Sequence, residues 1–189
     1  MSDEDRDIAV GQVLFASRGI GTERISPWMY PGKGKLPDLR GEFGKGGFFF
    51  SEVKSPRLDE APGGGFAHHT TMSKLLEMLR KARKQFESVN PKHLVPNILI
   101  WISRHFQLNW SNFVDAFHGH IGIGDQVLRD FRGADFVRRA ERDWRTIDLH
   151  VWLQVNEEDV VFEMKLFPLA SSEVLAPALL HALESSPRG

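Results

Sequence analysis

The chain has 189 residues, of which 41% are hydrophobic and 26% are charged, and its formal net charge is −1. This length suffices for one domain with a sizeable core, and the near-neutral charge excludes a globally basic nucleic-acid coat or an acidic tail protein, so any nucleic-acid site must be a local patch. Because the chain has no cysteine, disulfides, thiolate zinc sites and a cysteine nucleophile are excluded as well.

The N-terminal segment MSDEDRDIAV is acidic, and no apolar run approaches the ~20 residues that a membrane-spanning helix needs. We therefore expect no secretory signal, no membrane association and a cytoplasmic location. The next segment, IAVGQVLFAS, fits either a short helix or a strand, and Gly19-Ile20-Gly21 should end it.

In PGKGKLPDLRGEFGKGGFFFSEVKSP, residues 31–56, two β-prone pieces flank the turn-rich residues 44–47 and predict a hairpin. After a loop, LDEAPGGGFAHHTT, apolar residues recur every three or four positions and predict an amphipathic helix over 72–89, which Asn90-Pro91 ends. NILIWIS, at 97–103, is apolar on both alternating faces. This pattern is typical of a strand buried between two layers, so we expect it inside a sheet.

In the second half of the chain we expect helices at about 111–118 and 125–142. DLHVWLQVNEEDVVFEMKLF then predicts a second hairpin that turns at 156–159, and SSEVLAPALLHAL a last short helix, kinked near Pro177. This order of elements predicts an α/β fold with a mixed sheet of about four or five strands, flanked by helices, in a single domain.

The second strand of the first predicted hairpin carries an acid and a base on one face. Glu52 and Lys54 lie on the same side as Phe50, because side chains alternate along a strand. If the hairpin turns symmetrically about Lys45, Asp38 lies opposite Glu52. Two carboxylates this close repel each other unless a cation lies between them or one stays protonated. Since Mg²⁺ typically takes one or two carboxylates together with substrate phosphate, the pattern predicts a magnesium site.

Pro37-Asp38, a thirteen-residue spacer and Glu52-Val53-Lys54, followed by a helix and a buried strand, resemble the signature of the PD-(D/E)XK nucleases over about residues 36–103. The resemblance implies Asp38, Glu52 and Val53 as ligands of Mg²⁺ or Mn²⁺, and Lys54 as the residue that positions the attacking water. The implied activity is hydrolysis of phosphodiester bonds in nucleic acid, with DNA as the first expectation for the substrate.

The resemblance also implies a restriction-endonuclease-like fold, in which a mixed central sheet is flanked by helices. We expect its core at about residues 30–105 and a C-terminal elaboration, a hairpin and a helix, at about 106–189 of the single domain 1–189.

The predicted helix over 72–89 offers further candidate residues. In some nucleases of this type a glutamine on the helix after the lysine strand reaches the site, which implies Gln85 as a further catalytic residue. Arg80, Lys81 and Lys84 are candidates for contacts with nucleic-acid phosphates. A solvated face is the alternative interpretation, and the pairing of Glu77 with Lys81 at i, i+4 favours it.

A second Glu-x-Lys, Glu163-Met164-Lys165, lies on the second predicted hairpin, with Asp148 upstream. If that hairpin is centred on 157–158, Glu163 pairs with Trp152 and not with Asp148. We therefore favour the first triplet and interpret the second as a solvated pair on an edge strand.

Many PD-(D/E)XK nucleases carry a further glutamate on a helix before the Pro-Asp, and here Glu4 and Glu23 are the upstream candidates, neither in a convincing pattern. An alternative is therefore a catalytically inactive nuclease-like module that acts in protein–protein interaction or regulation. The expected partners are nucleic acid, a second copy of the chain or another protein.

Overall fold

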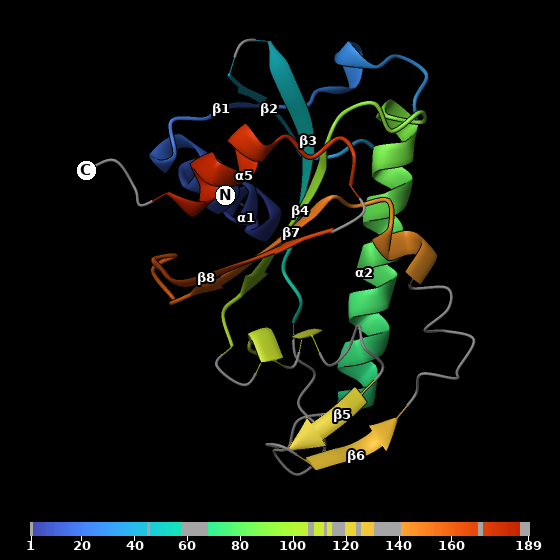
Figure 1. Ribbon diagram of the computed structural model, residues 1–189, viewed down its shortest axis with the longest axis vertical. Helices are drawn as coiled ribbons and strands as arrows, with labels where there is room; N and C mark the ends of the chain where they lie inside the picture. Colours follow the sequence, from blue (N-terminus) through green and yellow to red (C-terminus); the bar gives the residue numbers. More distant parts are fainter. Residues whose placement is uncertain are drawn as a thin grey trace.

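The computed structural model describes residues 2–44, 46–57, 68–105, 108–111, 113–114, 120–123, 126–130, 141–169 and 172–185. Its centre is one open sheet of six strands in the order β1-β2-β3-β4-β7-β8 (Figure 1). Neighbouring strands run parallel at β3–β4 and β4–β7 and antiparallel elsewhere. The predicted α/β class with a mixed sheet is confirmed, and the described sheet has six strands instead of four or five.

The N-terminal segment forms helix α1 (Asp3–Ser17), which resolves the ambiguity of IAVGQVLFAS. A capping box starts it: Ser2 Oγ accepts a hydrogen bond from Asp5 N at 3.1 Å, and the Asp5 carboxylate accepts one from Ser2 N. Gly19 follows the helix with a φ of +72°, a left-handed conformation that favours glycine, so the predicted break is confirmed.

The predicted first hairpin is present as β2 and β3, and a short edge strand and a 3₁₀ turn precede it. The bounds are β1 (Gly21–Arg24), η1 (Pro27–Met29), β2 (Leu39–Phe43) and β3 (Gly47–Lys54).

Helix α2 (His68–Val89) begins four residues before the predicted start at 72 and ends where Asn90 was expected to end it. The Asn90 side chain donates to Val95 O at 2.8 Å and to Asn97 Oδ1 at 3.0 Å, and so ties the end of α2 to the next strand. That strand is β4 (Asn97–Ser103), in which all seven residues are buried between β3 and β7. The prediction that NILIWIS is an internal strand is confirmed.

The C-terminal half differs in part from expectation. Its described elements are β5 (His120–Ile123), β6 (Gln126–Asp130), β7 (Leu149–Val155), β8 (Val161–Pro168) and α5 (Pro177–Glu184). The helix predicted over 125–142 is wrong at 126–130, because β6 pairs with β5 in a separate two-stranded sheet. Residues 141–144 are helical. Of the helix predicted over 111–118, residues 111, 113 and 114 are helical and the others lie outside the described part. Pro177 starts α5 and does not kink it, since proline needs no hydrogen-bonded N–H in a first turn.

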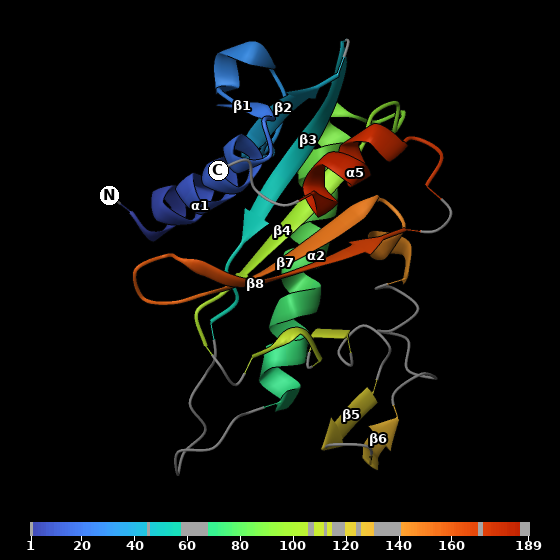
Figure 2. The same cartoon turned by 60° about the vertical axis from the view of Figure 1, so that its left-hand side comes forward.

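Helices cover both faces of the sheet, α1 and α5 on one side and α2 on the other (Figures 1 and 2). One core packs Leu14 and Phe15 of α1 and Leu179 of α5 against β3, β4 and β7. The other packs the apolar stripe of α2 against the opposite face, where Trp101 and Trp152 are fully buried. Within the described residues no helix combines the length and the apolar character that crossing a bilayer requires.

Candidate functional site

The register of the first hairpin is the one that the symmetric turn predicts. Leu39 pairs with Ser51 and Arg40 with Phe50, so residues whose numbers sum to 90 face each other. One step beyond the ladder, Asp38 N donates a hydrogen bond to Glu52 Oε2 at 3.1 Å. The prediction that Asp38 lies opposite Glu52 is confirmed, although Lys45 itself lies outside the described residues.

The carboxyl groups of Asp38 and Glu52 and the ammonium group of Lys54 gather on one face at the end of this hairpin. Lys54 Nζ forms an ion pair with Glu52 Oε1, and Asp38 Oδ2 accepts a hydrogen bond from Val53 N at 2.8 Å. The Val53 side chain lies in the opposite core beside Ile100, as expected. Val53 could therefore serve a metal only through its carbonyl oxygen.

Gln85 of α2 reaches the same cluster from the helix layer. Its Oε1 lies 3.4 Å from Lys54 Nζ, and its Nε2 donates to the carbonyl of Leu36 at 2.8 Å. The buried glutamine thus joins the helix, the segment before β2 and the lysine of β3. All four predicted catalytic residues, Asp38, Glu52, Lys54 and Gln85, are brought together by the tertiary structure.

Burial dominates the electrostatics of the two acids. Glu52 is 1% exposed, and burial raises its pKa from 4.5 to about 8, with the negative charge of Asp38 adding to the shift and Lys54 opposing it. Burial also raises the pKa of Asp38, while the hydrogen bond from Val53 N acts against the shift. Glu52 therefore keeps its proton to a higher pH than an ordinary glutamate does, and a cation near Asp38 and Glu52 would favour its ionisation.

Glu4 of α1 lies near enough to Asp38 to affect the pKa of its carboxyl group, and the sequence alone did not predict this proximity. Its negative charge is among the causes that raise the pKa of Asp38, and both residues line a cavity of about 340 Å³. The Ser2-x-x-Asp5 capping box was the available signal, because it marks a helix start and places Glu4 in the first turn. Glu23, the other upstream candidate, forms an ion pair with Arg40 at 3.0 Å.

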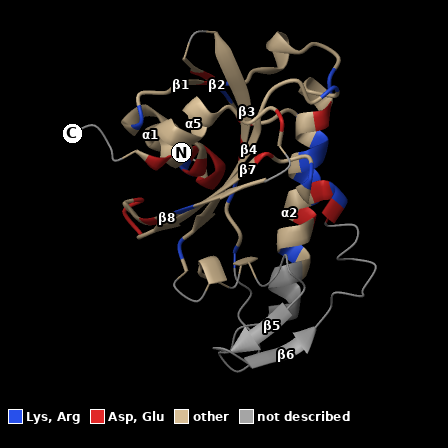
Figure 3. Ribbon diagram, viewed as in Figure 1, with Lys and Arg blue, Asp and Glu red and all other residues tan. Residues whose placement is uncertain are grey.

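Basic residues lie along α2, interleaved with acidic ones (Figure 3). Arg80, Lys81 and Lys84 are exposed, and Lys81 forms the expected i, i+4 ion pair with Glu77 at 2.6 Å. Lys81 also lines a cavity of about 340 Å³, together with Lys74 and with Arg57 from the segment after β3. Ser55, the residue after Lys54, and Glu77 line it as well, so a surface with three basic residues and one acidic residue adjoins the acidic cluster.

The second Glu-x-Lys lies on β8, the edge strand of the sheet. Lys165 and Glu163 are 3.4 Å apart and are 48% and 37% exposed, which confirms a solvated edge pair. Glu163 pairs with Gln154 and not, as predicted, with Trp152. The turn is centred on Glu158, where Asn156 N donates to Val160 O, and the ladder shifts by a further residue between Gln154 and Val155. Asp148 is buried away from this pair, where it accepts a hydrogen bond from Asn97 N at 2.7 Å.

The acid cluster could supply carboxylate oxygens and the Val53 carbonyl, the ligand type that Mg²⁺ and Mn²⁺ prefer. The raised pKa of Glu52 is compatible with a cation-binding carboxyl group, because a bound cation would compensate the negative charge that burial disfavours. In the part of the chain that the structure describes, no three His, Asp or Glu side chains are close enough to hold a metal between them. No protein-family model, curated protein or solved structure matches the chain.

Proposed function

We propose that this protein hydrolyses phosphodiester bonds of nucleic acid, above all DNA, with Mg²⁺ or Mn²⁺ bound at Asp38 and Glu52. The observation that carries the proposal is the meeting of these two carboxyl groups across the β2–β3 hairpin, on the face that also holds Lys54. The mixed sheet with helices on both faces is compatible with a restriction-endonuclease-like fold, which is part of the proposal.

In this proposal Asp38, Glu52 and the Val53 carbonyl hold the cation, which would activate a water molecule and neutralise charge on the scissile phosphate. Glu52 would be ionised in the presence of the cation, since its buried carboxyl group would then have a compensating charge beside it. Lys54 positions the attacking water or offsets the negative charge that develops on the phosphate.

Gln85 acts as a positioning residue. Its amide oxygen faces the Lys54 ammonium group, and its amide nitrogen is held by the Leu36 carbonyl. Because the glutamine is anchored on a helix and bonded to the strand segment before Asp38, it restricts where the lysine can point. Its loss should therefore weaken catalysis less than the loss of Lys54 itself.

The basic cavity beside Lys54 supports a polyanionic substrate. Arg57, Lys74 and Lys81 line this cavity together with Glu77. Phosphates on either side of the scissile bond would replace Asp3 and Glu77 as the ion-pair partners of Arg57 and Lys81. Such a local patch is compatible with the net charge of −1, because phosphate contacts depend on the nearby field and not on the total charge. Arg80 and Lys84, exposed on the same helix, would extend the surface for a longer duplex.

The direct test is incubation of the purified protein with plasmid and with single-stranded DNA in the presence of Mg²⁺ or Mn²⁺. Asp38→Asn, Glu52→Gln and Lys54→Met should each lower the cleavage rate by about 10²-fold or more. Glu42→Gln and Lys92→Met, at exposed positions outside the cluster, are the matched controls and should cleave as the unchanged protein does. Cleavage that survives all three site substitutions would remove the assigned site.

A catalytically inactive module that binds other proteins is the second candidate, and the observation that favours it is the exposed apolar start of β8. Val161 and Phe162 face solvent there. Calorimetry separates the two functions. Binding of Mg²⁺ that disappears in Glu52→Gln supports the nuclease, whereas the absence of Mg²⁺ binding together with the absence of cleavage supports the module.

A further inference from the structure

Strand β8 is the edge of the central sheet and exposes apolar side chains. Among the described residues it pairs with β7 alone. Val161 is 37% exposed and Phe162 is 67% exposed, and Val160, just before the strand, is 55% exposed. Natural sheets usually protect an edge with charges, proline, bulges or a covering segment, because its free main-chain groups can bind another strand. Strand β8 has two charges, a proline and an irregular start, yet its apolar side chains at Val161 and Phe162 remain exposed.

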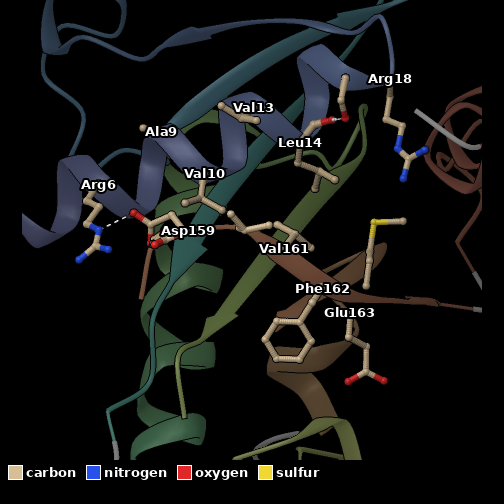
Figure 4. Close-up of a pocket in the computed structure, with 14 residues that line it drawn as sticks. Arg6, Ala9, Val10, Val13, Leu14, Arg18, Asp159, Val161, Phe162 and Glu163 are labelled. Carbon is tan, nitrogen blue, oxygen red and sulfur yellow. Dashed lines mark hydrogen bonds and ion pairs between the residues drawn. The ribbon is translucent and has the colours of Figure 1, made fainter. Parts of the chain in front are cut away.

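A groove of about 680 Å³ lies beside this edge, between α1 and the start of β8 (Figure 4). Val161, Phe162 and Met164 of the strand line it, together with Val13 and Leu14 of the helix. The apolar surface of the strand therefore continues onto the sheet face, and a partner at the edge would find side-chain contacts as well as main-chain hydrogen bonds.

The charges of β8 favour one partner, a second copy of the same strand. Two copies that pair antiparallel about a two-fold axis must set one residue opposite itself, and residues at equal distances on either side then face each other. If Met164 faces itself, Glu163 faces Lys165 of the second copy, and this opposite-charge pair occurs twice. If Glu163 or Lys165 faces itself, like charges meet.

The same register also matches the apolar residues. Phe162 comes to lie next to Leu166 of the second copy, and Val161, which the register irregularity puts opposite Val155 on the groove side of the sheet, adds a second apolar side chain there. Leu166 packs against the first core and Phe167 against Trp144, at 5.2 Å between ring centroids, so both lie on surfaces that are already apolar. Pro168, which has no N–H to donate, falls at the end of the paired segment, where a proline is tolerated.

We propose that this protein forms a two-fold symmetric dimer in which β8 pairs antiparallel with β8 of a second copy, centred on Met164, so that the two sheets become continuous. The dimer covers the exposed edge and the side chains of Val161 and Phe162. It does not depend on the proposed nuclease activity, since no residue of the Asp38–Glu52 cluster takes part.

The register is tested by reversing its two charges and measuring the mass in solution by analytical ultracentrifugation over a concentration series. Glu163→Lys alone sets two lysines against each other at both facing pairs, and Lys165→Glu alone sets two glutamates together at both. Each should raise the dimer dissociation constant about tenfold or more relative to the unchanged protein. An equimolar mixture of the two variants should dimerise again, because every facing pair is then of opposite charge.

The double variant Glu163→Lys/Lys165→Glu provides the matched control, since its homodimer restores both opposite-charge pairs. It should dimerise about as strongly as the unchanged protein. An unchanged protein that is monomeric throughout the series, or single variants that dimerise as it does, would overturn the proposal. So would a mixture that stays monomeric.

The absence of cysteine from the chain allows an independent check. Met164→Cys places a single thiol next to the two-fold axis and should form a disulfide-linked dimer on mild oxidation. Val13→Cys places a thiol on α1, an exposed position on the other side of the groove, and should not. Equal cross-linking of both variants, or none in Met164→Cys, contradicts the register.

Discussion

The buried carboxyl group of Glu52 should make the stability of this protein fall as the pH rises. Its pKa is about 8 in the folded protein against 4.5 as the ordinary value, so the folded state binds a proton that the unfolded state has already released. Stability from this group is therefore complete below pH 4.5 and is lost as the pH rises through 8. At about 1.36 kcal/mol per unit of pKa difference, the loss between pH 5 and pH 8 is about 3 kcal/mol.

Glu52→Gln should abolish this dependence, because the amide keeps the shape of the protonated acid and does not ionise. The assay is urea denaturation of both proteins at several pH values between 5 and 8, with the difference in the free energy of unfolding as the readout. Between pH 5 and pH 8 we expect the free energy of unfolding of the variant to rise by about 3 kcal/mol relative to that of the unchanged protein. Glu42→Gln, at an exposed position on the same hairpin, should follow the unchanged protein.

Added Mg²⁺ gives the same experiment a second readout. A cation at Asp38 and Glu52 favours the ionised acid, so it should stabilise the unchanged protein most at pH 8 and leave Glu52→Gln unaffected. Parallel pH dependences for the unchanged protein and Glu52→Gln would refute the reasoning from burial. A pH dependence that disappears in the variant without any response to Mg²⁺ would support the burial and contradict the metal site.

Two further predictions concern stability away from the site. Gly41→Ala should lower the free energy of unfolding by about 2 kcal/mol in urea denaturation, because a Cβ there would lie 2.1 Å from the Phe49 ring. Gly21→Ala is the control and should change the free energy of unfolding little, because no atom lies within 4 Å of its Cβ. Equal losses in the two variants would contradict this packing argument. The hydrogen bond to Asp148 raises the pKa of His93, so this contact stabilises the fold below pH 6.5 and is lost as the pH rises through the folded-state pKa. His93→Asn, which tolerates the local φ of +49°, should therefore cost about 1 kcal/mol more at pH 5.5 than at pH 8.5, and an NMR titration of His93 that shows no upward shift would contradict the assignment.

The sequence correctly predicted the features that depend on residues close together in the chain. The alternation of side chains and a symmetric turn led to the pairing of Leu39 with Ser51, because a tight hairpin leaves few registers that keep one face apolar. The spacing of apolar residues identified α2, and the two-sided apolarity of NILIWIS identified β4.

The same reasoning failed where the outcome depended on a partner or on an irregular turn. Residues 126–130 were expected in a helix and form β6, since pairing with β5 overrides a weak local preference. In the second hairpin the symmetric count missed a shift of the ladder between Gln154 and Val155, next to a turn in which Asp159 has a φ of +64°. Neither irregularity has a periodic signature.

The sequence by itself determined that Asp38, Glu52 and Lys54 share one face of a hairpin, because alternation and turn symmetry act over a few residues. Only the tertiary structure decided that Gln85 meets Lys54, that Glu4 lies near Asp38 and that Glu52 is buried. These contacts depend on how α1 and α2 pack against opposite faces of the same sheet, across 31 residues in the case of Lys54 and Gln85. Their chemistry, a carboxyl group with a pKa of about 8, is a property of that packing and of no single segment.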